Sequence, residues 1–167
     1  PADMVILSIG VRPDTGFLKD SGIELGARGE ILVNSYMETS APDVYALGDA
    51  AIVSHIVSEK QVLIPLASPA NKQGRIVGDN LCGRKTAYRG SQGTSIMKFF
   101  GLTVAVTGEK EENLQAQGRA FCKVITTSAS QAGYYPGGEM MTVKTLFEPD
   151  TGRILGAQIV GGKGVDK

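Results

Sequence analysis

The chain has 167 residues, of which 42% are hydrophobic, so it can bury the core of one domain or of two small ones. Its 17 basic and 17 acidic residues cancel and form no basic stripe, which argues against a nucleic-acid partner. No apolar run approaches the ~20 residues of a membrane span, and the start lacks the pattern of a signal peptide. We therefore expect a cytoplasmic protein that does not bind membranes.

The first strand-like segment is the continuous apolar run at residues 4–9, which ends in Gly10-Val-Arg-Pro13. Such a run is typical of a strand that is buried on both faces of a parallel sheet. A short helix is expected at 17–22, a turn at 26–29, and another strand at 30–34. The start of the chain is thus predicted to be sheet elements joined by turns.

A glycine-aspartate pair, Gly48 and Asp49, follows a short apolar run at residues 44–47 that a Pro42-Asp43 turn signal introduces. The run is expected to be a buried strand. A glycine at its carboxyl end lets a ligand approach the backbone, and the aspartate offers acceptors for hydroxyl groups. The pattern favours binding of a sugar-like polyol, but the same aspartate would also suit a turn or a helix cap.

A helix is predicted to begin at Ser68-Pro69, where serine caps free N–H groups and proline is preorganised for the first turn. It should run to about Cys82, with Gly83 as its stop. A small residue recurs every four positions along it: Ala70, Gly74 and Gly78. This face allows close packing of another backbone, and the helix N-terminus carries roughly half a positive charge that could also serve a ligand.

The second half of the chain is predicted to be a separate α+β unit, with a boundary near residues 83–93. Its strand-like segments are 94–100, 102–107, 119–125, 140–147 and 153–160. Segment 119–125 alternates like a half-buried strand, and residues 109–117 are a polar helix candidate. The last two strands flank a Pro/Asp/Gly turn at 148–152, which indicates an antiparallel hairpin.

The order of these motifs resembles the pyridine-nucleotide-disulfide oxidoreductases. The resemblance rests on residues 10–13, 39–51 and 65–75. It implies that Asp49, flanked by Gly48 and Ala50, binds the ribityl chain of FAD. It also implies that Pro65, Leu66 and Ala67 place a helix N-terminus at the pyrimidine side of the isoalloxazine.

The implied fold is α/β plus α+β: a C-terminal piece of a two-Rossmann flavoprotein, followed by an antiparallel-sheet dimerisation domain. Residues 1–29 would end the NAD-binding domain, 30–87 would belong to the FAD-binding domain, and 88–167 would form the dimerisation domain. The dimerisation domain is matched at 93–94, 107–108 and the closing stretch 154–161.

Within this family, residues 134–137 and 164–167 resemble the coenzyme A-disulfide reductase branch, which includes related NADH oxidases and polysulfide or persulfide reductases. In that branch a tyrosine of the first of these loops reaches the active site of the partner subunit. Tyr134 and Tyr135 are both candidates, as general acid or electrostatic stabiliser. Without the resemblance, the loop is a turn with two semi-exposed rings.

Several catalytic elements of the family are missing from these 167 residues. There is no Gly-x-Gly-x-x-Gly loop, and the nucleophilic cysteine of the family would lie upstream of Pro1. Cys82 and Cys122 are expected to be reduced, buried or incidental thiols, His55 is the only histidine, and no metal site is expected.

Two functions remain open on this basis. A full-length parent would be a homodimeric oxidoreductase that passes electrons from NAD(P)H through FAD and an upstream redox-active cysteine to a coenzyme A disulfide, a polysulfide or persulfide, or dioxygen. The 167-residue chain by itself would instead be a non-catalytic dimerisation and partial flavin-binding module. The residues do not determine the electron acceptor or the choice between NADH and NADPH.

Overall fold

The computed structural model describes residues 2–166, so Lys167 of the 164–167 motif lies outside the described residues. The chain forms two compact units. The first comprises Pro1–Val53 and Val62–Arg89, and the second comprises Ser54–Gln61 and Gly90–Lys167. The chain therefore passes from one unit to the other three times.

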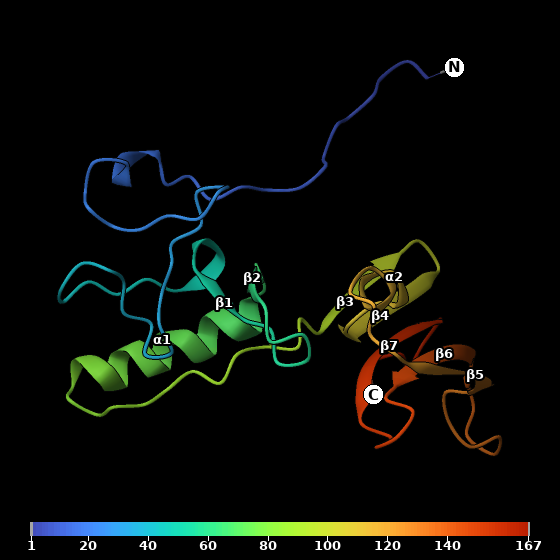
Figure 1. The fold of residues 1–167 in the computed structure, drawn as a ribbon. Coiled ribbons are helices and arrows are strands. Elements are labelled where there is room, and N and C mark those ends of the chain that lie inside the picture. The colour runs from blue at the N-terminus through green and yellow to red at the C-terminus, as the bar shows by residue number, and fades with distance from the viewer. Residues whose placement is uncertain (1, 167) are drawn as a thin grey trace. The chain divides into compact units, whose positions relative to one another are not determined.

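The first unit is built around helix α1 (Ala67–Leu81). It also contains two 3-10 helices, η1 (Gly16–Leu18) and η2 (Gly48–Ala50). The short strands β1 (Ile52–Ser54) and β2 (Gln61–Leu63) pair with each other (Figure 1), and one residue of each, Ser54 and Gln61, already belongs to the second unit. The buried hydrophobic side chains of this unit are Met37, Ala51, Val53, Ile64 and Val77.

The strand expected at residues 4–9 does not form. Its apolar side chains are 77% to 90% exposed, and Figure 1 shows the segment as an extended coil. A strand of a parallel sheet needs neighbours along its edges and cover on its faces, and no described residue pairs with this segment.

Other predictions in this unit are met in part. Residues 30–34 and 44–47 form only isolated bridges, at Ile31 and Tyr45, and the helix expected at 17–22 is reduced to η1. The turn at 26–29 is confirmed, because the N–H of Gly29 donates to the carbonyl of Gly26.

Helix α1 begins earlier than predicted. Its N-cap is Leu66, which makes no side-chain cap, so the prediction of Ser68 as the cap is wrong. Pro69 lies in the first turn, where an α-helix has no partner for its N–H groups and therefore tolerates proline. The end is confirmed: Cys82 is the C-cap, and Gly83 follows with a left-handed φ of 83°.

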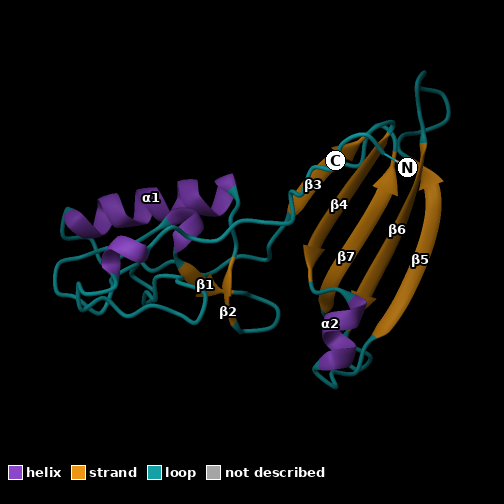
Figure 2. Ribbon diagram, turned by 90° about the horizontal axis from the view of Figure 1, so that it is seen from above, coloured by secondary structure: helices purple, strands orange, loops and turns teal. Residues whose placement is uncertain are grey.

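The second unit is a five-stranded antiparallel sheet with one short helix, as predicted. The strands are β3 (Ser95–Phe99), β4 (Leu102–Gly108), β5 (Cys122–Ala129), β6 (Met140–Phe147) and β7 (Ile154–Gly161). Their order in the sheet is β3-β4-β7-β6-β5, and the predicted 140–160 hairpin is the β6–β7 pair. Figure 2 shows α2 (Glu111–Ala116) at the end of the sheet where β4 ends.

The core of the second unit is Val57, Leu114, Leu146 and Leu155, with Phe121 packed against it. Strand β5 corrects one expectation, because all of its residues are exposed and the predicted half-buried alternation is absent. It is an edge strand that, among the described residues, pairs with β6 alone. Arg119, expected inside this strand, precedes it and donates to the carbonyl of Val57 and to Glu148.

Candidate functional site

The candidate flavin residues Gly48, Asp49 and Ala50 form η2, which lies against helix α1. The N–H of Gly48 donates to the side-chain Oε1 of Gln73 at 2.7 Å. A Cβ added to Gly48 would lie 4.0 Å from the Cβ of Ala70. The residue has a left-handed φ of 79°, a backbone conformation that favours glycine. The local backbone thus explains why glycine precedes the aspartate.

The predicted small-residue face of α1 has neighbours at two of its three positions, at ordinary van der Waals distance. Ala70 faces Gly48, and a Cβ on Gly74 would meet the side chain of Leu47 at 4.0 Å. Gly78 has no such neighbour within 4 Å. Residues 47–50 therefore lie beside the first half of the helix and not beside its end.

The carboxylate of Asp49 is exposed and takes part in none of the hydrogen bonds of residues 2–166. Asp49 is the second residue of η2, whose N-cap is Leu47 and has no side-chain cap. The alternative role as a helix cap is therefore not observed, and the carboxylate oxygens remain available as acceptors.

Pro65, Leu66 and Ala67 form the entry to α1. Pro65 and Ala67 are exposed and Leu66 is half-buried. Because Leu66 offers no side-chain cap, the first N–H groups of the helix keep their donor capacity at its positive end. The first unit thus holds acceptors on Asp49 and donors at the start of α1, and a helix side chain, Gln73, links the two segments.

Tyr134 and Tyr135 lie in the turn between β5 and β6 of the second unit. Their side chains are 82% and 60% exposed, and their ring centroids are 4.8 Å apart. Two hydrogen bonds within the turn stabilise it: the N–H of Tyr135 donates to the carbonyl of Ala132, and Gln131 Nε2 donates to the carbonyl of Pro136 at 2.9 Å. Both phenols are therefore presented to solvent by an anchored loop.

His55 is buried and makes structural contacts only. Its Nε2 lies 3.3 Å from the carbonyl of Gln92. Its Nδ1 lies 3.1 Å from the hydroxyl oxygen of Ser58, 3.2 Å from the backbone N of Ser58 and 3.5 Å from Glu109 Oε1. A Ser-His-Glu relay needs the hydroxyl and the carboxylate on opposite ring nitrogens. Here both partners share one nitrogen, so the cluster is not a nucleophilic triad.

The two cysteines are free and exposed, so they are not buried thiols as one of the sequence alternatives had it. Among residues 2–166 no cluster of three His, Cys, Asp or Glu side chains could hold a metal ion. None of the helices in this part of the chain is long and apolar enough to cross a membrane.

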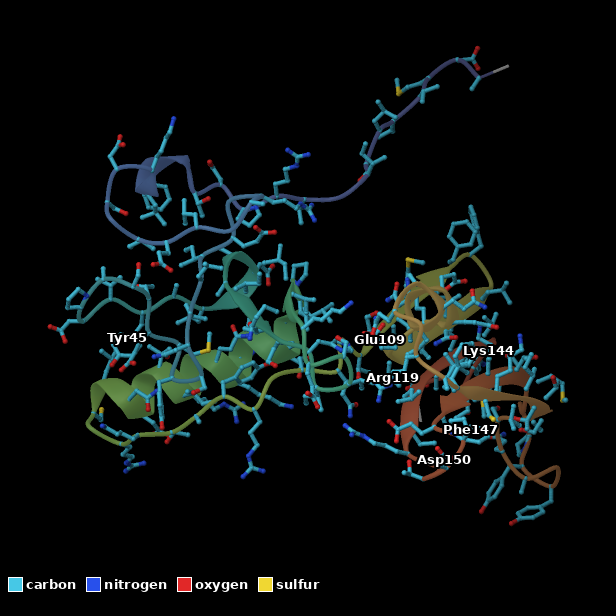
Figure 3. All side chains as sticks on the ribbon, viewed as in Figure 1. Tyr45, Glu109, Arg119, Lys144, Phe147 and Asp150 are labelled. Atoms are coloured by element: carbon cyan, nitrogen blue, oxygen red, sulfur yellow. The ribbon has the colours of Figure 1, made fainter. Side chains whose placement is uncertain are left out.

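Two carboxyl groups with a lowered pKa, Glu111 and Glu148, lie in ion pairs of the second unit, whereas the pKa of Glu30 in the first unit is lowered by hydrogen bonds from the backbone N–H groups of Glu30 itself and Arg28. A hydrogen bond from Lys123, and then one from Lys144, holds the pKa of Glu111 below its ordinary value. The hydroxyl of Thr151, and then the guanidinium of Arg119, lowers the pKa of Glu148. Arg119 and Lys144 are labelled in Figure 3. These shifts mark structural ion pairs, which also perturb pKa values.

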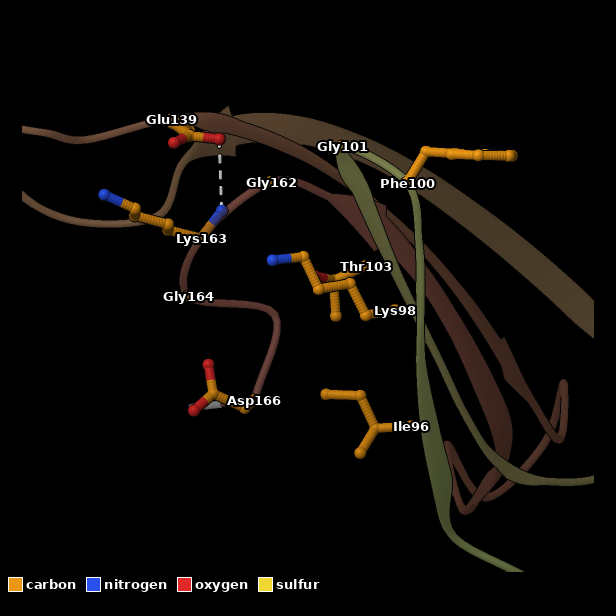
Figure 4. Close-up of a pocket in the computed structure, with 10 residues that line it drawn as sticks. All are labelled: Ile96, Lys98, Phe100, Gly101, Thr103, Glu139, Gly162, Lys163, Gly164 and Asp166. Carbon is orange, nitrogen blue, oxygen red and sulfur yellow. Dashed lines mark hydrogen bonds between the residues drawn. The ribbon is translucent and has the colours of Figure 1, made fainter.

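A hollow of about 400 Å³ lies beside the end of β7 in the second unit (Figure 4). Lys98 and Asp166 line it, and the N–H of Lys163 donates to Glu139 Oε2 at 3.1 Å. Gly164 and Asp166 of the 164–167 motif line it, but none of the candidate catalytic or flavin-binding residues does. Gln73 was not predicted from the sequence as a site residue. It could have been found as a polar residue on the buried face of the helix, because Leu66, Ala70, Gln73 and Val77 follow helical spacing.

Residues 1–74 match the family described as pyridine nucleotide-disulphide oxidoreductase, and residues 94–166 match its dimerisation domain. An NAD(P)H sulfur oxidoreductase (CoA-dependent) of Pyrococcus furiosus is 36% identical, over 97% of this chain and 37% of that protein. An NADH oxidase of Enterococcus faecalis is 39% identical, over 95% of this chain and 35% of its own length.

Among solved structures, reduced Bacillus anthracis CoADR-RHD superimposes with a TM-score of 0.93 and 45% identity. The match covers 98% of this chain and 30% of that one. The chain therefore spans little more than a third of the length of the curated relatives it matches.

Proposed function

This chain belongs to the pyridine nucleotide-disulphide oxidoreductase family, and on that premise we propose that it forms part of a flavoprotein that passes electrons from NAD(P)H through FAD to a sulfur acceptor or to dioxygen. The sulfur acceptor would be a coenzyme A disulfide, a persulfide or a polysulfide. The relatives named above for CoA-dependent sulfur chemistry and for NADH oxidation support this range of acceptors.

The single observation that carries the proposal is the arrangement of η2 on α1. The residues fit FAD, because the Asp49 carboxylate accepts no hydrogen bond within residues 2–166 and the start of α1, which has no side-chain cap, offers backbone N–H donors. FAD, when bound, supplies the electron carrier of the reaction. In this assignment Asp49, with Gly48 and Ala50 beside it, holds the ribityl hydroxyls, and Pro65, Leu66 and Ala67 place the positive helix end where flavin gains negative charge.

We assign residues 1–29 to the end of an NAD-binding domain, 30–87 to an FAD-binding domain and 88–167 to a dimerisation domain. The match of residues 94–166 to the dimerisation domain of the family supports a homodimer. In such a dimer Tyr134 or Tyr135, both exposed, would donate a hydrogen bond to a thiolate or developing anion at the partner's site.

A second function is favoured by the short span of the matches and by the absence of a Gly-x-Gly-x-x-Gly loop from the 167 residues. By itself this chain would be a dimerisation and partial flavin-binding module without catalysis. Half a pocket without a pyrophosphate loop should lose its cofactor during purification.

The flavin absorbance of two purified proteins tests both functions. A longer protein that carries this chain should retain FAD, lose its colour with NADH or NADPH under argon, and regain it with coenzyme A disulfide, polysulfide or air. The 167-residue chain alone should be colourless. A longer protein that neither retains FAD nor responds to NAD(P)H would overturn the proposed function, and a coloured 167-residue chain would overturn the second one.

A further inference from the structure

Gln73 is a polar side chain with only 1% of its surface exposed, in the middle of α1. Amide side chains are mostly found at the surface, and buried ones are hydrogen-bonded. Its Oε1 accepts the N–H of Gly48 at 2.7 Å, across 25 residues of sequence. Within residues 2–166, this is the only hydrogen bond between η2 and a side chain of α1.

The Gly48 N–H depends on this acceptor. Gly48 is the first residue of η2, and the preceding Leu47 provides no side-chain cap. The first N–H groups of a helix have no partner within it, so an outside acceptor must satisfy them. If Gln73 is removed, the Gly48 N–H lies beside α1 without an acceptor, and η2 loses its polar link to the helix.

Helix α1 fixes the distance between its own N-terminus and the side chain that holds Gly48. Gln73 is six residues after Ala67, which corresponds to a rise of about 9 Å along the helix axis. Leu66, Ala70 and Gln73 follow the i, i+4, i+7 spacing of one helix face. The distance between the start of α1 and the anchored η2 is therefore set by a rigid element.

We propose that Gln73 is a positioning residue for the flavin: it fixes Gly48, and with it the Asp49 carboxylate, at a set distance from the N-terminal donors of α1. The inference rests on the proposed function, because it assigns both segments, η2 and the start of α1, to FAD. Gln73 acts through Gly48 and needs no contact with the reacting atoms. Its loss should loosen the hold on FAD and alter the flavin spectrum without unfolding the first unit.

The test compares three variants of the FAD-containing longer protein. Gln73→Met keeps the side-chain volume but lacks the acceptor, Gln73→Glu keeps an acceptor oxygen, and Lys72→Met is the control at the next, exposed position of α1. The measurements are the hydrogen-exchange rate of the Gly48 N–H, the FAD dissociation constant and the flavin absorbance spectrum. For Gln73→Met we expect the exchange rate of the Gly48 N–H and the FAD dissociation constant each to rise about tenfold. The flavin absorbance band should also shift.

Gln73→Glu should restore slow exchange and most of the FAD affinity, and Lys72→Met should match the parent in all three measurements. Wild-type exchange at Gly48 in Gln73→Met would overturn the inference, and so would faster exchange with unchanged FAD binding. If Gln73→Met does not fold, Gln73→Glu provides the test. A folded Gln73→Glu protein whose Gly48 N–H exchanges fast would contradict the hydrogen-bond link between residue 73 and Gly48. Asp49→Ala distinguishes failure of this inference from failure of the proposed function. If Asp49→Ala loses FAD while Gln73→Met binds it normally, only the positioning role of Gln73 is refuted. If both variants bind FAD normally, the proposed function is refuted.

Discussion

Asp49 is the residue proposed to bind the ribityl chain, and its exposed carboxylate makes no hydrogen bond within residues 2–166. Asp49→Ala in an FAD-containing protein should leave a ribityl hydroxyl without its acceptor, at a cost of about 1–3 kcal/mol. FAD affinity should then fall about tenfold or more, measured by titrating the apoprotein with FAD. Asp20→Ala, at another exposed position, is the control. Equal flavin retention in both variants would contradict the assignment.

Tyr134 and Tyr135 are the residues proposed to act at the partner's site, and both side chains are exposed. Changing either to Phe removes one donor and keeps the ring. If one of them stabilises a thiolate, that variant should slow reoxidation of the flavin by the sulfur acceptor about tenfold to a hundredfold, because a hydrogen bond to a charged group contributes about 1.5–3 kcal/mol.

Rapid mixing of the two half-reactions separates this role from a general defect. Flavin reduction by NAD(P)H should be nearly unchanged in both variants. If neither Tyr134→Phe nor Tyr135→Phe slows the oxidative half-reaction, the loop is structural, and the assignment to the coenzyme A-disulfide reductase branch loses its main support.

At the scale of the element, a glycine inside α1 and the glycine that follows its C-cap have opposite requirements. Gly78 has open space around its Cα and helical backbone, so Gly78→Ala should stabilise the chain by about 0.5–1 kcal/mol through the higher helix propensity of alanine. Gly83 has a φ of 83°, so Gly83→Ala should destabilise it by about 1–2 kcal/mol. Urea unfolding of this chain measures both, and equal signs for the two variants would contradict the assigned helix end.

The ion pairs of Glu111 tie α2 to β5 and β6 and should make stability depend on pH. Hydrogen bonds from Lys123 and Lys144 lower its pKa from 4.5. A carboxyl with a lowered folded-state pKa contributes stability that is present above its unfolded pKa and is lost as the pH falls through the folded value. The thermal midpoint should therefore drop below about pH 4.5, and Glu111→Gln should lessen that drop. An identical pH profile for the variant would rule out the contribution.

At the scale of the whole molecule, the exposed apolar side chains of the second unit predict self-association. They include Ile96, Met97, Phe99, Leu102, Ile125, Met140 and Ile154, each at least half exposed. Large exposed apolar surfaces on proteins usually bind partners, and a two-fold pair is the commonest arrangement. Sedimentation should show a dimer at micromolar concentration, and Ile125→Glu with Met97→Glu should shift it toward monomer. A monomeric parent under these conditions would refute the prediction.

Local chemistry allowed the sequence alone to determine the second unit and the end of α1. Strand periodicity, the Pro/Asp/Gly turn after β6 and the left-handed preference of Gly83 act between neighbouring residues, so they can be predicted from the chain order. The Gly48-Asp49 pair could be found in the same way, because a glycine needed for a left-handed φ and an acceptor beside it are adjacent. The resemblance of the ordered motifs to the oxidoreductase family is confirmed over residues 1–74 and 94–166.

Contacts between distant residues decided the rest. An apolar run at 4–9 is not a strand without a neighbour to pair with, and the alternation at β5 does not produce burial on an edge strand. Gln73 meets Gly48 only because α1 packs on η2 across 25 residues, and His55 is occupied by Gln92 and Glu109 from segments 37 and 54 positions away. Side-chain roles of this kind depend on which segments become neighbours after folding, and no local pattern of residues contains that information.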